Sequence, residues 1–419
     1  MNPPRGADLD SLQTLSIEHL RQRTYGSLIQ VVESRDIELG RSFVAAYHSD
    51  GLRVYTRIDV PVTPPPPEGY PVVVFAHGWR GIDAAPSLDF YYASDTYYYA
   101  TINAFRDAGF VVFVPGYRGH GTVAGELAEG LDYLAAWDTG TYLTPVFYAI
   151  DLLNLLDGLA SVEVASLNLK RVNMVGHSQG GDATLFALAI AGEGSAVSQT
   201  VHAASIWAGT IAPRFTQLVS IAPMQQSAQA FLSGDGTWTG TAFGSDGEQN
   251  ADFIFAWPSD EIESLDAQQW TWQHEQYGDR TVHDVLVAKT TVMYQALNRH
   301  VHDRHTDYAF SVEHGDAMKT RIVHDPRVIN AYDRIEVFDR AEWLTEPLNL
   351  HFSDRDFYSP PDWNNALCQR LAQAGNRCEG FEYPYNTHIL GVSPHSFFSP
   401  AGSREGHQQA VERDVALFR

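Results

Sequence analysis

Apolar side chains follow two patterns along the first half of the chain. Residues 52–60 alternate polar and apolar side chains, which predicts a strand with one buried face. Residues 72–76 and 110–114 are short, continuous apolar runs with glycines soon after them, and such runs are typical of strands buried on both faces. Residues 171–175 predict a further strand. These segments therefore predict a buried, mostly parallel sheet.

Segments with helical spacing lie between these strands. Apolar residues recur at helical spacing after Pro145, at Val146, Ile150, Leu153 and Leu156. Residues 179–191 predict the next helix. The alternation of strand and helix predicts the α/β class, with a doubly wound, mostly parallel sheet.

This alternation is interrupted in the middle of the chain. Residues 212–345 are rich in aromatic, Gln, Asp and His side chains, and we expect a largely helical lid or cap insertion above the carboxyl edge of the sheet. The predicted core consists of residues 51–211 and 346–419, and its second segment ends with a strand over 379–383 and a terminal helix. Residues 1–50 form a predicted N-terminal extension.

A candidate nucleophile follows the predicted strand over 171–175. The motif Gly176-His177-Ser178-Gln179-Gly180 places a serine among small residues where a predicted helix begins. In a sharp strand-to-helix turn the serine hydroxyl is exposed, and glycines on either side avoid clashes. We therefore predict that Ser178 is a nucleophile, and a glycine-rich turn with an incidental serine is the alternative.

A serine hydroxyl becomes a good nucleophile only when a base accepts its proton and an acid orients that base. The loop after the strand that ends near residue 352 holds Asp354 and Asp356. We favour Asp356 because a proline four residues later opens the next predicted helix. The loop after the last strand holds His388, which we expect to be the base, and His395 is the alternative.

The attacked carbonyl becomes an oxyanion, which needs preorganised hydrogen-bond donors worth roughly 3 to 4 kcal/mol each. The motif His77-Gly78-Trp79-Arg80-Gly81 directly follows the predicted strand over 72–76. We expect the backbone N–H of Trp79 to form an oxyanion hole with the backbone N–H of Gln179. A tight turn with no such role is the alternative.

These motifs resemble those of α/β-hydrolases of the dienelactone hydrolase and prolyl-oligopeptidase-like group. The resemblance rests on His77-Gly78, Gly116-Tyr117-Arg118-Gly119-His120-Gly121, Gly176-His177-Ser178-Gln179-Gly180, Asp356 and His388. It implies the α/β-hydrolase fold and a serine, acid and histidine in that chain order. It covers about residues 50–210 and 346–419. The insertion, where substrate preference usually lies, is not covered.

Aromatic and histidine side chains near these loops indicate where a substrate could bind. We expect the pocket to be lined by His77, His177, Tyr91 and Tyr117. Four tryptophans of the insertion would suit the walls of an acyl or aryl site, although packing of the lid explains them equally well: Trp238, Trp257, Trp270 and Trp272. A metal could use the histidines between 300 and 305, but triad hydrolysis requires no metal or cofactor, and we predict none.

Composition limits the possible partners. The 419-residue chain has a formal charge of −23, from 28 basic and 51 acidic residues, so we expect no nucleic-acid partner. No apolar run approaches the roughly 18 residues that span a membrane, and the first residues lack the apolar core of a signal peptide. Acidity and a high Tyr, Trp and Asn content nevertheless favour a secreted or periplasmic protein. Cys368 and Cys378 form either a local disulfide or two buried thiols.

Taken together, the motifs predict an enzyme that hydrolyses small-molecule or polymeric carboxylic esters through an acyl-enzyme intermediate. A serine peptidase or aminoacyl amidase is the alternative, although the sequence offers no paired acidic anchor for a peptide terminus. A non-catalytic binding protein on a hydrolase scaffold is a third interpretation. The oligomeric state stays open.

Overall fold

The computed structural model describes residues 13–37, 40–90, 98–138, 143–192, 194–211, 334–338, 340–353, 359, 361–383 and 403–419, together with four short strands between residues 238 and 323. The chain divides into two compact units. The larger unit comprises Ile17–Ala135, Thr144–Ile211 and Asp339–Arg419. The smaller unit comprises Met1–Ser16, Ala136–Leu143 and Ala212–Phe338.

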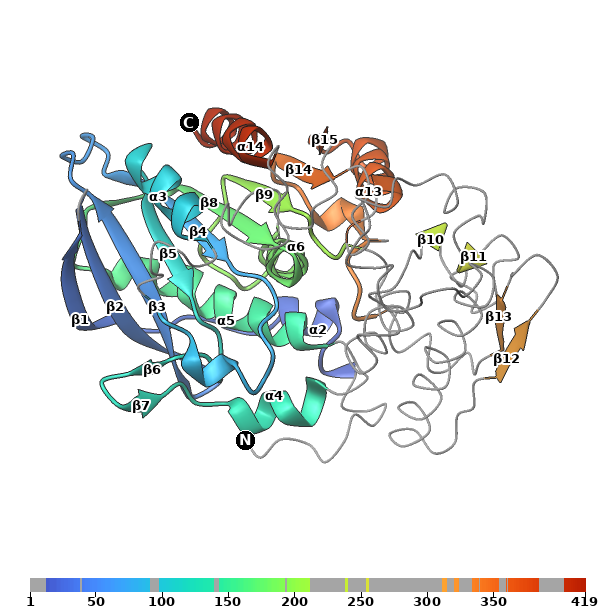
Figure 1. The fold of residues 1–419 in the computed structure, drawn as a ribbon, viewed down its shortest axis with the longest axis horizontal. Coiled ribbons are helices and arrows are strands. Elements are labelled where there is room, and N and C mark those ends of the chain that lie inside the picture. The colour runs from blue at the N-terminus through green and yellow to red at the C-terminus, as the bar shows by residue number, and fades with distance from the viewer. Residues whose placement is uncertain are drawn as a thin grey trace, which may run out of the picture. The chain divides into compact units, whose positions relative to one another are not determined.

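A nine-stranded sheet forms the centre of the larger unit, in the order β1-β2-β3-β5-β4-β8-β9-β14-β15 (Figure 1). The strands are β1 (Gln30–Ile37), β2 (Gly40–Ser49), β3 (Leu52–Pro61), β4 (Tyr70–Ala76), β5 (Val111–Pro115), β8 (Leu167–His177), β9 (Ala203–Trp207), β14 (Leu348–Ser353) and β15 (Cys378–Tyr383). Pairing is antiparallel from β1 to β5 and parallel from β5 to β15. Because β5 is buried at every position, its sequence is continuously apolar rather than alternating, and β9, which is also buried throughout, has Ser205 as its single polar residue.

Helices lie on both faces of this sheet, as the sequence predicted. The described helices are α2 (Ile17–Arg21), α3 (Tyr99–Asp107), α4 (Leu131–Asp138), α5 (Thr144–Gly158), α6 (Gln179–Ala191), α13 (Pro361–Gln373) and α14 (Ser403–Phe418). The chain moves one way along the sheet through β4, α3 and β5, and the opposite way through β5, α5 and β8. Since such crossovers are right-handed, α3 and α5 cover opposite faces. Figure 1 shows α3 beside α14, α5 beside α6, and α6 beside α2.

The predicted N-terminal extension over residues 1–50 includes two strands of the central sheet. Strands β1 and β2 pair with each other and β2 pairs with β3, so the first three strands form an antiparallel meander. Phe43, Val44 and Tyr47 of β2 are buried. Their apolar run is short and lies next to polar and charged positions, which is why the sequence pattern did not separate it from a peripheral segment.

Short elements complete the described part of the chain. Three 3₁₀ turns, η1 (Ala85–Ser87), η2 (Leu159–Ser161) and η5 (Ala341–Trp343), and the hairpin β6 (Thr122–Val123) with β7 (Glu126–Leu127) belong to the larger unit. In the smaller unit β10 (Trp238–Thr239) pairs with β11 (Ile254–Phe255), and β12 (Ser311–His314) pairs with β13 (Thr320–Val323). The helices predicted for the insertion, and His300–His305, lie outside the described residues.

A disulfide joins Cys368 of α13 to Cys378, the first residue of β15, across a sequence separation of 10. This pairing confirms one of the two alternatives that the sequence left open. It ties α13 to the last strand of the sheet beside it, and the described residues contain no unpaired cysteine. None of the described helices is both long and apolar enough to cross a membrane.

Candidate active site

Ser178 lies in a tight turn between β8 and α6. Its backbone has φ 55° and ψ −125°, a conformation that costs free energy for a residue with a side chain. A Cβ on Gly176 would lie 2.4 Å from the carbonyl oxygen of Gly180, and a Cβ on Gly180 would lie 2.2 Å from the carbonyl oxygen of Ala76. Only glycine fits at both positions, so the spacing of the motif follows from the close approach of three backbone segments. The N–H of Ser178 donates to the carbonyl of Trp207 at 2.9 Å, which fixes the turn to β9.

The loop after β4 reaches the same turn. Strands β4 and β8 are parallel neighbours with Ala76 opposite Gly176, so the residues that follow them emerge side by side. A Cβ on Gly78 would lie 3.0 Å from the Cβ of Ser178. Between β4 and β8 the strand order changes direction, and ligands of open α/β sheets bind at the carboxyl ends of strands at such a point.

The backbone N–H groups of Trp79 and Gln179 have no acceptor among the described residues. Gln179 is the first residue of α6, where backbone N–H groups lack partners within the helix and the helix dipole favours negative charge. Gly181 and Asp182 behind it donate to the carbonyl of Ser178, so they are already engaged. The Trp79 side chain is 54% exposed, whereas Gln179 is buried. The structure thus brings together the serine and both expected oxyanion donors.

His77 and Tyr117, expected in the substrate pocket, are buried in the core. The ring nitrogens of His77 contact the carbonyl oxygens of Gly78 at 2.8 Å and Gly116 at 3.4 Å. The Tyr117 ring stacks on Tyr148 of α5 at a centroid distance of 4.2 Å, and its hydroxyl donates to the carbonyl of His77 at 3.2 Å. These partners are backbone groups and buried rings, and the pocket role of both residues stays a prediction. Burial lowers the pKa of His77 to about 4.

The Gly116–Gly121 turn is held by a buried ion pair. Arg118 Nη2 lies 2.7 Å from Asp151 Oδ1 of α5, and the backbone N–H of Arg118 donates to Asp151 Oδ2 at 2.8 Å. The guanidinium also lies over the rings of Tyr133 and Phe147. His120 in the same turn is buried, and its burial lowers its pKa to about 3. The motif therefore stabilises the core beneath the β4 loop.

Tyr98 is a residue of this site that the sequence analysis did not single out from its neighbours. Its hydroxyl accepts a hydrogen bond from the N–H of Gly78 at 2.8 Å and lies 2.8 Å from Nδ1 of His177. His177 itself is 3% exposed, and its ring contacts the Tyr98 ring edge-on. The only sequence signal was a run of three tyrosines over 97–99, and nothing in that run distinguishes one tyrosine from its neighbours.

The predicted acid, base and last pocket residue lie outside the described residues: Asp356, His388 and Tyr91, together with the alternatives Asp354 and His395. The strands that lead to them are described. Strand β14 ends at Ser353 and β15 ends at Tyr383, and both run parallel to β8 and β9. Both strands therefore end at the same carboxyl edge of the sheet as the Ser178 turn.

A buried carboxylate joins these two strands to the C-terminal helix. Asp414 of α14 accepts hydrogen bonds from Asn349 at 2.9 Å and from Trp207 at 2.7 Å, and its Oδ1 lies 2.9 Å from His351 Nε2. His351 Nδ1 lies 2.8 Å from the hydroxyl of Tyr383, the last residue of β15. In this network each buried donor has an acceptor, which is the condition for burying so many polar groups at low cost.

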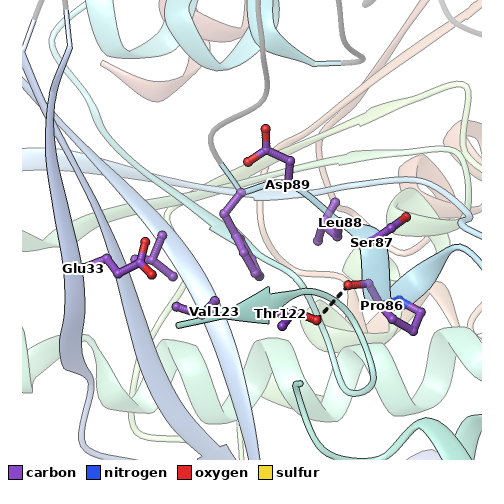
Figure 2. Close-up of a pocket in the computed structure, with 9 residues that line it drawn as sticks. Glu33, Pro86, Ser87, Leu88, Asp89, Thr122 and Val123 are labelled. Carbon is purple, nitrogen blue, oxygen red and sulfur yellow. Dashed lines mark hydrogen bonds between the residues drawn. The ribbon is translucent and has the colours of Figure 1, made fainter. Parts of the chain in front are cut away.

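A pocket with a volume of about 280 Å³ lies elsewhere in the larger unit. Figure 2 shows its labelled residues, with Glu33 of β1 on one side and Asp89 on the other. The Thr122 hydroxyl donates to the carbonyl of Pro86 at 3.0 Å, and both residues line the pocket. None of the residues that line this pocket is one of the predicted site residues.

No protein-family model matches the sequence, and no curated protein matches it. Among solved structures, an acetyl xylan esterase from Paenibacillus sp. R4 matches with a TM-score of 0.50 at 14% identity, over 98% of this chain and 99% of that chain. A dipeptidyl peptidase 4 from Porphyromonas gingivalis matches with a TM-score of 0.47 at 13% identity, over 94% of this chain and 35% of that chain. At such identities similarity establishes the fold alone. The strand order, the turn at Ser178 and the first of these matches show that the chain has the α/β-hydrolase fold.

Proposed function

We propose that this protein is a serine hydrolase that cleaves carboxylic esters through an acyl-enzyme intermediate. The observation that carries the proposal is the strained Ser178 turn, whose neighbours Trp79 and Gln179 have backbone N–H groups without a described acceptor. A positive φ at a serine costs free energy and is retained where the surrounding structure imposes it, which is common at active sites. The full-length match to an esterase fold supports esters as the first substrate class to test.

In the proposed reaction the Ser178 hydroxyl attacks the ester carbonyl while His388 accepts its proton. Asp356 holds the histidine in the required tautomer. The tetrahedral oxyanion accepts hydrogen bonds from the N–H groups of Trp79 and Gln179. His388 then gives the proton to the leaving alcohol. In the second step His388 accepts a proton from water, the water attacks the acyl carbon, and Ser178 leaves with the proton that His388 returns.

The test is turnover of a panel of p-nitrophenyl esters of increasing acyl length and of aminoacyl p-nitroanilides. We expect esters to be preferred and Ser178→Ala to lose turnover by a factor on the order of 10⁴ to 10⁶. Ser198→Ala is the matched control because Ser198 is exposed and bonds to Asp157. A fluorophosphonate should add one adduct to the wild type and none to Ser178→Ala.

The outcomes separate the three candidate functions. Preference for anilides, lost in Ser178→Ala, would replace the esterase by a peptidase. Absence of turnover together with an unreactive Ser178 would indicate a binding protein on a hydrolase scaffold. Ester turnover that persists in Ser178→Ala would exclude Ser178 as the nucleophile.

A further inference from the structure

The Tyr98 hydroxyl lies between the two backbone segments that meet at the proposed nucleophile. One segment is the loop after β4, whose Gly78 N–H donates to the hydroxyl at 2.8 Å. The other is the end of β8, where His177 Nδ1 lies 2.8 Å from the same oxygen. Tyr98 itself comes from a third segment, since it immediately precedes α3. One hydroxyl therefore connects three parts of the chain next to Ser178.

The backbone at Tyr98 adopts a conformation that its side chain disfavours. Its φ of 71° and ψ of −10° lie in the left-handed region, which costs a residue other than glycine on the order of 1 kcal/mol. Packing offsets this cost, because the Tyr98 side chain is buried and its ring contacts that of Phe75 of β4 edge-on, with 5.1 Å between the ring centroids. The strained backbone places the hydroxyl beside Gly78 and His177.

The hydrogen bond at Gly78 also selects the oxyanion donor in the β4 loop. Because the Gly78 N–H is already directed at Tyr98, it is not available to a substrate oxygen. The next N–H, that of Trp79, has no acceptor among the described residues. A donor that is fixed before the reaction stabilises the oxyanion without reorganising, and misplacement by even about 0.5 Å weakens it.

We propose that Tyr98 is a positioning residue that fixes the position of the Trp79 N–H relative to the Ser178 turn. In this arrangement the hydroxyl accepts from Gly78 N–H and donates to His177 Nδ1, so His177 carries its proton on Nε2. The inference rests on the proposed serine hydrolase function. It concerns only how accurately the oxyanion donors are placed, and Tyr98 takes no part in proton transfer.

Tyr98→Phe tests this role, because it keeps the ring that packs on Phe75 and removes the hydroxyl. We expect kcat on the preferred ester to fall about 10- to 100-fold with KM changed less than about threefold, since the interaction acts on the transition state. The affinity of a trifluoromethyl ketone, which forms a tetrahedral adduct, should fall by the same factor as kcat/KM. Tyr55→Phe is the control, because it removes a hydroxyl that donates to the backbone carbonyl of Glu126 at 3.2 Å.

A second variant keeps the test independent of folding effects. His177→Ala leaves the Tyr98 hydroxyl bonded to Gly78, so it should reduce kcat less than Tyr98→Phe does. The double variant should be no worse than Tyr98→Phe alone, because contacts in one network are not additive. Losses that multiply, an unchanged kcat in folded Tyr98→Phe, or an equal loss in Tyr55→Phe would overturn the inference. The proposed function would survive each of these results provided that Ser178→Ala is inactive.

Discussion

The two sides of the proposed catalytic edge are built by different means. On the side of β4 and β8, backbone segments approach so closely that a methyl group at Gly176 or Gly180 would collide with carbonyl oxygens. On the side of β14 and β15, buried side chains around Asp414 hold the strands to α14. Close backbone approach requires glycines at fixed spacing, so it is visible as a short motif in the sequence. The side-chain network consists of polar residues that are far apart in the sequence and come together only in the folded chain.

The largest loss of stability is expected from adding a Cβ where backbone segments meet on the first side. Gly180→Ala places a Cβ 2.2 Å from the carbonyl oxygen of Ala76 and 2.4 Å from that of His77. Backbone has to move, so we expect a loss of more than about 4 kcal/mol in the free energy of unfolding, or insoluble protein. Gly81→Ala is the matched control, because its added Cβ meets only the Trp79 ring at 3.5 Å. Denaturant unfolding measures both, and equal stabilities would contradict this account.

Low pH should also destabilise the first side, because two histidines are buried there. Burial lowers the pKa of His77 to about 4 and that of His120 to about 3, whereas both titrate near 6.5 in an unfolded chain. Below about pH 6.5 the unfolded chain binds protons that the native protein does not bind. The free energy of unfolding should therefore fall as the pH is lowered, on the order of 2 kcal/mol per histidine by pH 5.

Urea unfolding at pH 7, 6 and 5 measures this loss. His120→Asn keeps a donor for the carbonyl of Arg118, which His120 Nδ1 contacts at 2.9 Å, and removes one titrating group. The pH dependence of the variant should be shallower than that of the wild type by about one proton. Identical slopes would show that His120 does not titrate differently in the two states.

On the second side, Asp414→Asn should cost about 3 kcal/mol. One carboxylate oxygen accepts from Trp207 and the other faces Asn349 and His351, so an amide group would direct N–H protons at one of these donors. Charge-assisted hydrogen bonds are lost and a buried donor is left unpaired. Glu412→Gln on the exposed face of α14 is the control and should change stability by less than about 0.5 kcal/mol. Equal thermal midpoints for the two variants would refute the role of Asp414.

The smallest of the four effects is expected from the disulfide beside β15. Closing a loop with a sequence separation of 10 removes chain entropy worth roughly 2 to 3 kcal/mol from the unfolded state. The Cys368→Ser, Cys378→Ser double variant should lose about this much stability and retain ester turnover at low temperature. Thiol titration of the unfolded wild type without reductant should count no free sulfhydryls at these positions, and a count of two would contradict the bond.

The sequence predicted those elements whose signals are local. Apolar runs identified β4 and β5, and the glycines around Ser178 identified the turn because only glycine fits there. Pairing between distant residues gave no such signal. Asp414 bonds to Trp207 at a separation of 207 positions, and each residue alone reads as an ordinary helix or strand position. Tyr98 could not be predicted for a related reason. Its position depends on a left-handed backbone conformation, which a tyrosine in the sequence does not indicate.

The place of the insertion has a consequence for how such a protein can diversify. Residues 212–338 belong to the smaller unit, yet β9 before them and β14 after them are hydrogen-bonded neighbours in the sheet. The connection can therefore change in length and composition while the register of the strands stays the same. A lineage with this architecture is free to exchange more than a hundred residues without rebuilding the sheet that carries the Ser178 turn.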